Sequence, residues 1–120
     1  MSYPFTINTI TASELKEKIN TNPELLIINV LNQQYFNDCH IPKSVNIEYE
    51  RLVENLASLD KDKEIVLYCA QDSCPKSKHA YALLADLGFT NLFDYTAGIK
   101  DWIKRGFDVT GVCAMPYLHD

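Results

Sequence analysis

The feature of this chain that most constrains its fold is a set of three short apolar runs, each of strand length, separated by segments of helical pattern. The runs are "LLIINV" at 25–30, "EIVLYC" at 64–69 and "TNLFDY" at 90–95. A continuous apolar run of four to eight residues is typical of a strand that is buried on both faces. Strands of this kind belong in a parallel sheet, so the runs favour an α/β domain.

The segments between the runs carry helix signals. Thr11 followed by Glu14 fits a capping box and predicts a helix over 12–20. Apolar residues recur every three or four positions in 48–59, which predicts an amphipathic helix there. The remaining expected elements are a helical turn or two after residue 31, a strand near 45–47, a helix between Pro75 and Gly88, and a short helix closed by Gly106.

Strands and helices that alternate in this way predict a three-layer α/β domain with a central, mainly parallel sheet and helices on both faces. The chain has 120 residues, of which 47% are hydrophobic, and no repeat or low-complexity stretch divides it. A chain of this size buries one real core. We therefore expect a single domain over residues 1–120.

The charge pattern excludes several classes of partner. The formal net charge is -5, and acidic and basic residues are interspersed, so the positive surface that nucleic acids or anionic membranes attract is missing. The longest apolar runs are far shorter than the roughly 20 residues of a membrane-spanning helix. The first ten residues lack the basic start and apolar block of an export signal, which predicts a cytoplasmic protein.

Four cysteines occur, at positions 39, 69, 74 and 113. In a cytoplasmic chain they are expected to be reduced thiols without a structural disulfide, and packing as a small hydrophobe is the default for each.

Cys69 is the exception because of its position at the end of a predicted strand. In parallel sheets, ligands and catalytic groups gather at the carboxyl ends of the strands. The loop "AQDSCP" follows, and the helix near Pro75 directs its positive end toward that loop. This environment predicts a depressed pKa for Cys69, whose thiolate is the nucleophilic form. The alternative is a thiol that only packs at the end of a buried strand.

Two long segments resemble the rhodanese family of sulfurtransferase domains. "LLIINVLNQQYFNDCHIPKSVNI" is similar to the family's first strand, acidic helix and G-H-I-P-G-A-x-N signature. "EIVLYCAQDSCPKSKHAYALLADLGFTNLFDYTAGIKDW" is similar to its strand with the active cysteine, the following loop and helix, and a G-G-I-x-x-W close. The resemblance covers nearly the whole chain.

The resemblance implies that Cys69 takes a sulfane sulfur from a small-molecule donor, holds it as a persulfide and passes it to a thiol, cyanide or protein acceptor. It also implies that no metal or organic cofactor is needed. The backbone N–H groups of the loop would cradle the anion, and such groups at a helix start stabilise thiolate and persulfide alike. The residues of this loop are Ala70, Gln71, Asp72, Ser73 and Cys74.

Cys74 departs from the family pattern, in which an arginine often occupies its position. Arginine gives a rigid fork for an anionic donor, whereas Cys74 gives none and Asp72 adds repulsion. Lys76 and Lys78 are flexible substitutes, so thiosulfate is expected to be a poor donor. Cys74 has two interpretations: a resolving thiol that attacks an oxidised or persulfidated Cys69, or a residue that packs inward at the start of the helix.

Three further hypotheses compete with sulfur transfer. A zinc site would use the C-x4-C pair with Cys39, His40 or His79, but neighbouring residues do not readily converge on one ion. Phosphatase or arsenate-reductase chemistry needs an arginine in the loop, which is absent. A catalytically silent rhodanese-like binding module would explain the missing arginine but leaves the cysteine at the strand end without a role.

Overall fold

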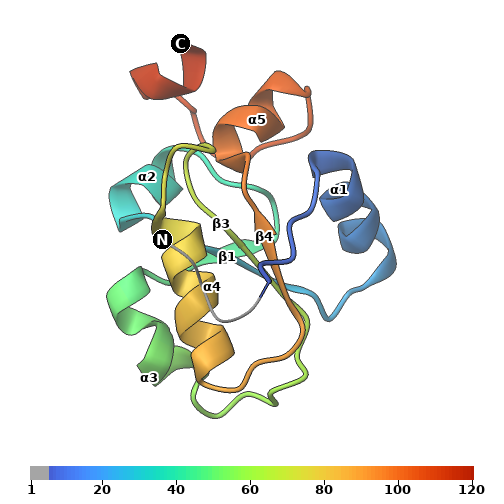
Figure 1. The fold of residues 1–120 in the computed structure, drawn as a ribbon. Coiled ribbons are helices and arrows are strands. Elements are labelled where there is room, and N and C mark those ends of the chain that lie inside the picture. The colour runs from blue at the N-terminus through green and yellow to red at the C-terminus, as the bar shows by residue number, and fades with distance from the viewer. Residues whose placement is uncertain (1–5) are drawn as a thin grey trace.

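The computed structural model describes residues 6–120 (Figure 1). Its helices and strands alternate along the chain, as the apolar runs predict. In chain order they are α1 (Ala12–Thr21), β1 (Leu26–Asn29), α2 (Gln33–Asp38), β2 (Ser44–Asn46), the 3-10 helix η1 (Tyr49–Arg51), α3 (Leu52–Leu56), β3 (Ile65–Tyr68), α4 (Lys76–Asp86), β4 (Leu92–Tyr95), α5 (Gly98–Lys104) and the 3-10 helix η2 (Pro116–His119).

The four strands form one parallel sheet in the order β2-β1-β3-β4. The register places Asn29 at the end of β1 opposite Tyr68 at the end of β3, and Tyr68 opposite Tyr95 at the end of β4. The carboxyl ends of the three strands therefore meet at one edge of the sheet. The predicted parallel α/β fold is confirmed.

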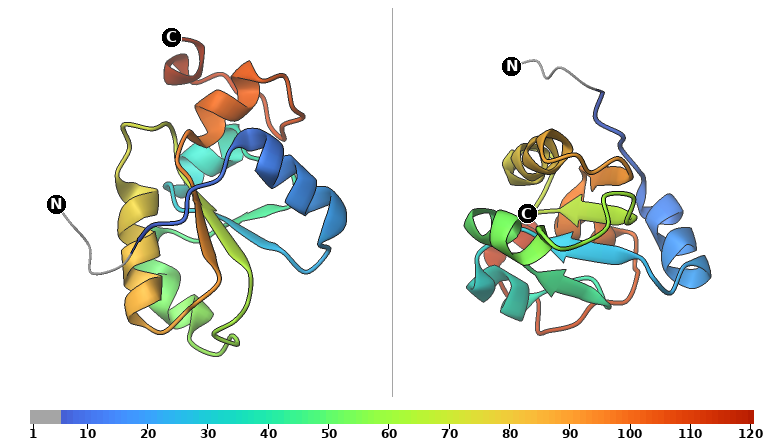
Figure 2. Two further views of the ribbon diagram at one scale, coloured as in Figure 1. Left: turned by 45° about the vertical axis from the view of Figure 1, so that its right-hand side comes forward. Right: turned by 90° about the horizontal axis from the view of Figure 1, so that it is seen from below.

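Helices cover both faces of the sheet, because successive strand residues point to opposite sides. Leu67 and Cys69 pack with the buried residues of α3 and α4, whereas Val66 and Tyr68 pack with those of α1 and α5. Figure 2 shows α3 and α4 together on one side of the sheet and α1 on the other. This alternation is the physical reason for the continuous apolar runs in the sequence.

The capping box of α1 is confirmed. The Thr11 side chain accepts the N–H of Glu14, and the Glu14 carboxylate accepts the N–H of Thr11. The single helix predicted over 48–59 is wrong: the segment divides into η1 and the short helix α3. At both ends of segment 48–59 the chain is tightened by i to i−3 hydrogen bonds. The N–H of Arg51 donates to the carbonyl oxygen of Glu48, and the N–H of Leu59 donates to that of Leu56.

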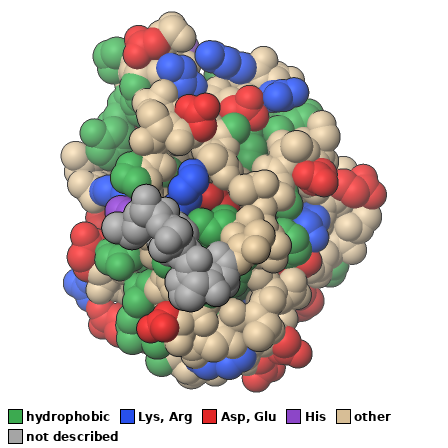
Figure 3. Space-filling view, viewed as in Figure 1, with side chains coloured by type: hydrophobic (Ala, Val, Ile, Leu, Met, Phe, Trp, Pro, Cys, Tyr) green, Lys and Arg blue, Asp and Glu red, His purple; other side chains and the backbone are tan. Residues whose placement is uncertain are grey.

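The surface agrees with the charge pattern of the sequence. Figure 3 shows acidic and basic side chains interspersed over the visible face. Among residues 6–120, no helix has the length and apolar character needed to cross a membrane, and the longest, α4, has 11 residues.

Candidate functional site around Cys69 and Cys74

Cys69 directly follows β3 and is fully buried at the carboxyl edge of the sheet. Its Sγ lies 3.4 Å from the carbonyl oxygen of Cys74 and 3.5 Å from Oγ of Ser77, a buried residue in the first turn of α4. The thiol therefore points at the loop and at the start of the following helix, as its position in the sequence predicts.

The start of α5 fixes the backbone on which Cys69 sits. The N–H groups of Ile99 and Lys100 donate to the carbonyl oxygens of Cys69 and Ala70, each at 3.0 Å. Gly98 makes this contact possible, since it has φ +73° and an added Cβ would lie 2.6–2.7 Å from the backbone of Cys69 and Ala70. The close approach explains the glycine before "IKDW".

The loop from 70 to 74 is a tight turn in which the N–H of Cys74 donates to the carbonyl oxygen of Gln71 at 2.9 Å. That amide is committed to the turn and does not face the anion site, contrary to its expected place in the cradle. The N–H groups of Lys76 and Ala70 instead act to lower the pKa of Cys74, and the N–H of Ser77 acts to lower that of Cys69. The N–H groups that favour an anionic sulfur thus come partly from the first turn of α4.

The two thiols differ in acidity, and the more acidic thiol is Cys74, whereas the sequence predicts a lowered pKa for Cys69. The pKa of Cys69 is raised, because its thiol donates to the Cys74 sulfur and because it is buried. The hydrogen bond from Cys69 lowers the pKa of Cys74 to about 5, against the opposing effect of burial. The pKa of Cys69 is therefore shifted upward, in the opposite direction to the depressed pKa that its position in the sequence predicts, and the pKa of the less buried Cys74 is shifted downward.

A pocket of about 400 Å³ opens beside the loop. Cys74 lies in its wall and is partly exposed, whereas Cys69 lies behind it. The Lys76 ammonium also borders the pocket. The residues that line the pocket are Leu31, Asn32, Tyr35, Ala70, Gln71, Ser73, Cys74, Lys76 and Tyr117.

Asp72 lies away from this pocket, although its charge was expected to repel an anionic donor. It lines two shallow depressions on the other side of the loop, one of which it shares with Lys100 and Lys104 of α5. The acidic group thus faces cations rather than the thiols. Lys78 is also directed elsewhere, with Nζ 3.7 Å from the buried carboxylate of Asp94.

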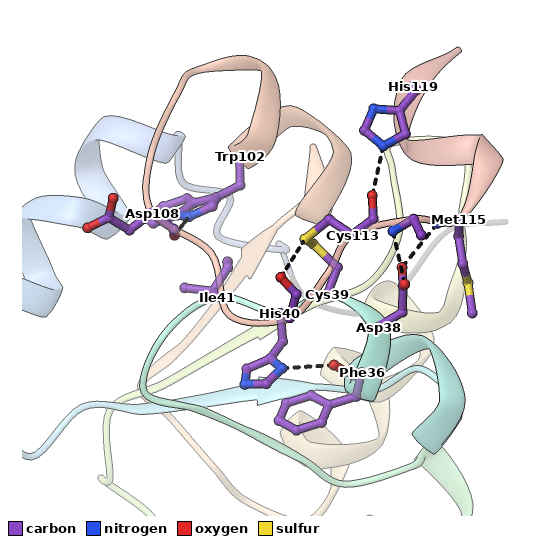
Figure 4. The surroundings of a disulfide bond; sticks show 12 residues. Phe36, Asp38, Cys39, His40, Ile41, Trp102, Asp108, Cys113, Met115 and His119 are labelled. Carbon is purple, nitrogen blue, oxygen red and sulfur yellow. Dashed lines mark hydrogen bonds between the residues drawn. A yellow bond between two sulfur atoms is a disulfide. The ribbon is translucent and has the colours of Figure 1, made fainter.

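Cys39 and Cys113 form a disulfide, which corrects the expectation of four reduced thiols. Figure 4 shows the bond joining the end of α2 to the segment after α5. The two residues are 74 positions apart in the sequence. Two backbone hydrogen bonds bring their segments together: the N–H of Thr110 donates to the carbonyl oxygen of His40, and the N–H of Cys113 donates to that of Asp38. Cys69 and Cys74 are both free.

The histidines proposed as zinc ligands have other surroundings. The His40 ring stacks on Phe36 and its Nδ1 lies 2.8 Å from the Phe36 carbonyl oxygen, while His79 is exposed on α4. Cys39 is occupied by its disulfide. Over residues 6–120, no group of three or more His, Cys, Asp or Glu side chains is arranged to hold a metal ion.

The fold and the site define an α/β domain with a thiol pair at the carboxyl end of a central parallel strand. The sequence model of the rhodanese-like domain family matches residues 11–105. The chain belongs to this family.

The relatives place the chain in the general sulfurtransferase class. It is 32% identical over 96 residues to YtwF of Bacillus subtilis, and the match covers 80% of this chain and 90% of YtwF. The name of YtwF gives its assignment as a sulfurtransferase as provisional. It is 29% identical over 77 residues to the thiosulfate sulfurtransferase GlpE of Pseudomonas savastanoi, covering 64% of this chain and 71% of GlpE. Among solved structures, the rhodanese-like domain of Alr3790 from Anabaena matches with a TM-score of 0.79 and 26% identity, covering 92% of this chain and 86% of that one.

Proposed function

We propose that the protein is a single-domain sulfurtransferase in which Cys69 carries the transferred sulfur as a persulfide. The observation that carries the proposal is the placement of Cys69 at the carboxyl end of β3, with its sulfur against Ser77 at the start of α4 and a second thiol between it and the pocket. A helix start supplies N–H donors for an anionic sulfur. The pocket gives a small molecule access to Cys74, behind which Cys69 lies.

The transfer balances as two displacements at sulfur. In the first, the Cys69 sulfur bonds to the outer sulfur of a persulfide donor R–S–S⁻; the S–S bond of the donor breaks, R–S⁻ leaves with the electron pair, and it takes up the proton of Cys69. The product is R–SH and the Cys69 persulfide anion. In the second, an acceptor thiolate or cyanide bonds to the outer sulfur, and the Cys69 thiolate leaves with the electron pair.

Cys74 supports the first displacement as the proton relay of the pair. Its thiolate accepts the hydrogen bond from Cys69, so it can take the Cys69 proton as the new bond forms. An anionic inorganic donor is repelled by this thiolate, and the loop has no arginine that would attract it. Thiosulfate is a dianion without an organic part, whereas an organic persulfide carries one charge on sulfur and an organic part that the pocket can contact, so thiosulfate is the poorer donor in our proposal.

The proposal is tested by mass spectrometry of the intact protein after incubation with thiosulfate, inorganic polysulfide and glutathione persulfide in separate samples. We expect a gain of one sulfur that peptide mapping assigns to Cys69, and transfer of that sulfur to cyanide as thiocyanate. Cys69→Ser should lose both the gain and the transfer. If Cys69→Ser still transfers sulfur at the parent rate, the assignment is wrong; if the parent gains none from any donor, the silent binding module is favoured.

A second function, thiol–disulfide redox chemistry, is favoured by two free thiols at one site, with the Cys69 sulfur 3.4 Å from the carbonyl oxygen of Cys74. The Cys74 thiolate would attack the inner sulfur of the protonated persulfide, Cys69–S–SH; the S–S bond of the persulfide breaks, HS⁻ leaves with the electron pair and the proton, and the Cys69–Cys74 disulfide forms. A peptide map of the persulfidated protein in the absence of acceptor should then show this disulfide. Persulfide that persists on Cys69 with Cys74 free would exclude the resolving step.

A further inference from the structure

The C-terminal tail, residues 107–120, lies outside the segment that the family model matches and still reaches the active-site pocket. Figure 1 shows it leaving α5 and ending in the red helix above α2, near the carboxyl edge of the sheet. Tyr117 of this helix lines the pocket opposite Cys74, and its ring meets that of Tyr35 edge-on with centroids 6.0 Å apart. One wall of the pocket is thus specific to this tail.

The tail is held in place at several points. The Cys39–Cys113 disulfide fastens it to the end of α2, and both oxygens of the Asp38 carboxylate accept N–H groups of the residues that follow, Ala114 at 3.0 Å and Met115 at 3.3 Å (Figure 4). Beyond the pocket wall, Leu118 is buried in the core. Tyr117 lies between these attachments, so its ring has a defined position.

The chemistry of the pocket indicates what it receives. Two tyrosine rings and Leu31 provide an apolar wall, and burial raises the pKa of Tyr117 to about 12, so its hydroxyl stays neutral near pH 7. Lys76 has no carboxylate partner among residues 6–120; its ammonium donates to Oδ1 of Asn32 at 3.5 Å and attracts the Cys74 sulfur, and it is the cation at this pocket that an anionic group of a ligand would meet. A volume of about 400 Å³ is in the range of small organic ligands and exceeds the needs of a small inorganic ion.

We propose that Tyr117, held over the pocket by the Cys39–Cys113 disulfide, is a specificity-determining residue that selects organic persulfides with an apolar body and a carboxylate over inorganic sulfur donors. The inference rests on the proposed sulfurtransferase function. The ring covers the organic part of the donor, the carboxylate meets Lys76, and the outer sulfur faces the thiol pair. The disulfide acts as a positioning device because it fixes the tail without touching the donor.

The test compares two donors, N-acetylcysteine persulfide and inorganic polysulfide, with cyanide as acceptor and the uncatalysed rate subtracted. For Tyr117→Ala, the ratio of kcat/KM for the organic donor to that for polysulfide should fall about five- to tenfold, the usual worth of a buried aromatic contact. Tyr117→Phe keeps the ring and should restore the ratio to within about twofold of the parent. Val112→Ala is the matched control, since Val112 belongs to the same tail and is 83% exposed.

The role of the disulfide is tested in the same assay with Cys39→Ala/Cys113→Ser, which leaves no new free thiol and avoids a reductant that would consume persulfide. We expect a fall of the same order, and combining it with Tyr117→Ala should give less than the product of the separate effects. Circular dichroism confirms that each variant is folded. If the ratio is unchanged in folded Tyr117→Ala, or falls equally in Val112→Ala, the inference is wrong while sulfur transfer by the parent still stands; a parent inactive with both donors contradicts the proposed function itself.

Discussion

At the residue scale, the thiol pair shows how position divides two identical side chains into different roles. Cys69 is fully buried and its pKa is raised by the Cys74 side chain and by burial, while Cys74 is partly exposed and its pKa is lowered by Cys69 and by N–H groups of the loop and α4. The pair therefore places the more acidic thiol at the pocket and the less acidic thiol behind it. In the family pattern, an arginine supplies positive charge at the position of Cys74, whereas our proposal gives Cys74 a role in proton transfer.

The acidity of Cys74 gives a prediction with a definite sign. A lowered pKa means that the thiolate is present above about pH 5 and is lost as the pH falls below that value. Alkylation of Cys74 by iodoacetamide, followed by peptide mapping between pH 4 and 9, should therefore rise with a midpoint near 5. Cys69→Ala removes the donated hydrogen bond and should move the midpoint upward, whereas Cys69→Ser keeps a hydroxyl donor and should move it less. A midpoint near the ordinary cysteine value of about 8.5 in the parent would contradict the lowered pKa of Cys74.

At the element scale, the sequence predicts the elements whose signals are local. The apolar runs locate β1, β3 and β4, and the position of Cys69 at the end of β3 follows from the same pattern. The helix predicted over 48–59 fails because periodicity does not distinguish α-helical from 3-10 bonding in a short segment. The proton sharing between the thiols is not predictable either, since it depends on side-chain orientation within the turn.

The docking of α5 on the strand end makes a prediction for two glycines with similar φ. Gly98 has φ +73° and no room for a Cβ, whereas Gly106 has φ +80° and nothing within 4 Å of an added Cβ. Gly106→Ala should cost about 1–2 kcal/mol of unfolding free energy from the left-handed conformation alone. Gly98→Ala should cost about 1–3 kcal/mol more, because the backbone of Cys69 and Ala70 must move. Denaturant unfolding measures both, and equal losses would contradict the close contact.

At the scale of the whole molecule, the tail couples two parts of the chain that the sequence keeps far apart. Cys39 and Cys113 are separated by 74 residues, and their pairing depends on the path of the tail past Asp38. Gly111, with φ +108°, passes so close to the Asp38 carbonyl that a side chain would collide with it. No local sequence pattern predicts such a path. For this reason the sequence predicts free thiols at positions 39 and 113 and does not place Tyr117 in the site.

The disulfide makes the stability of the molecule sensitive to reduction. A bridge across a loop of this length restricts the unfolded chain and contributes about 2–4 kcal/mol in ordinary cases. Cys39→Ala/Cys113→Ser should therefore lower the free energy of unfolding by about 2–4 kcal/mol, measured in denaturant without reductant. The parent in dithiothreitol should lose a similar amount, and Cys74→Ser, which removes a thiol outside the bridge, should show the same sensitivity to dithiothreitol as the parent. A parent whose unfolding midpoint is unchanged by the reductant would mean that the bridge does not stabilise the native protein.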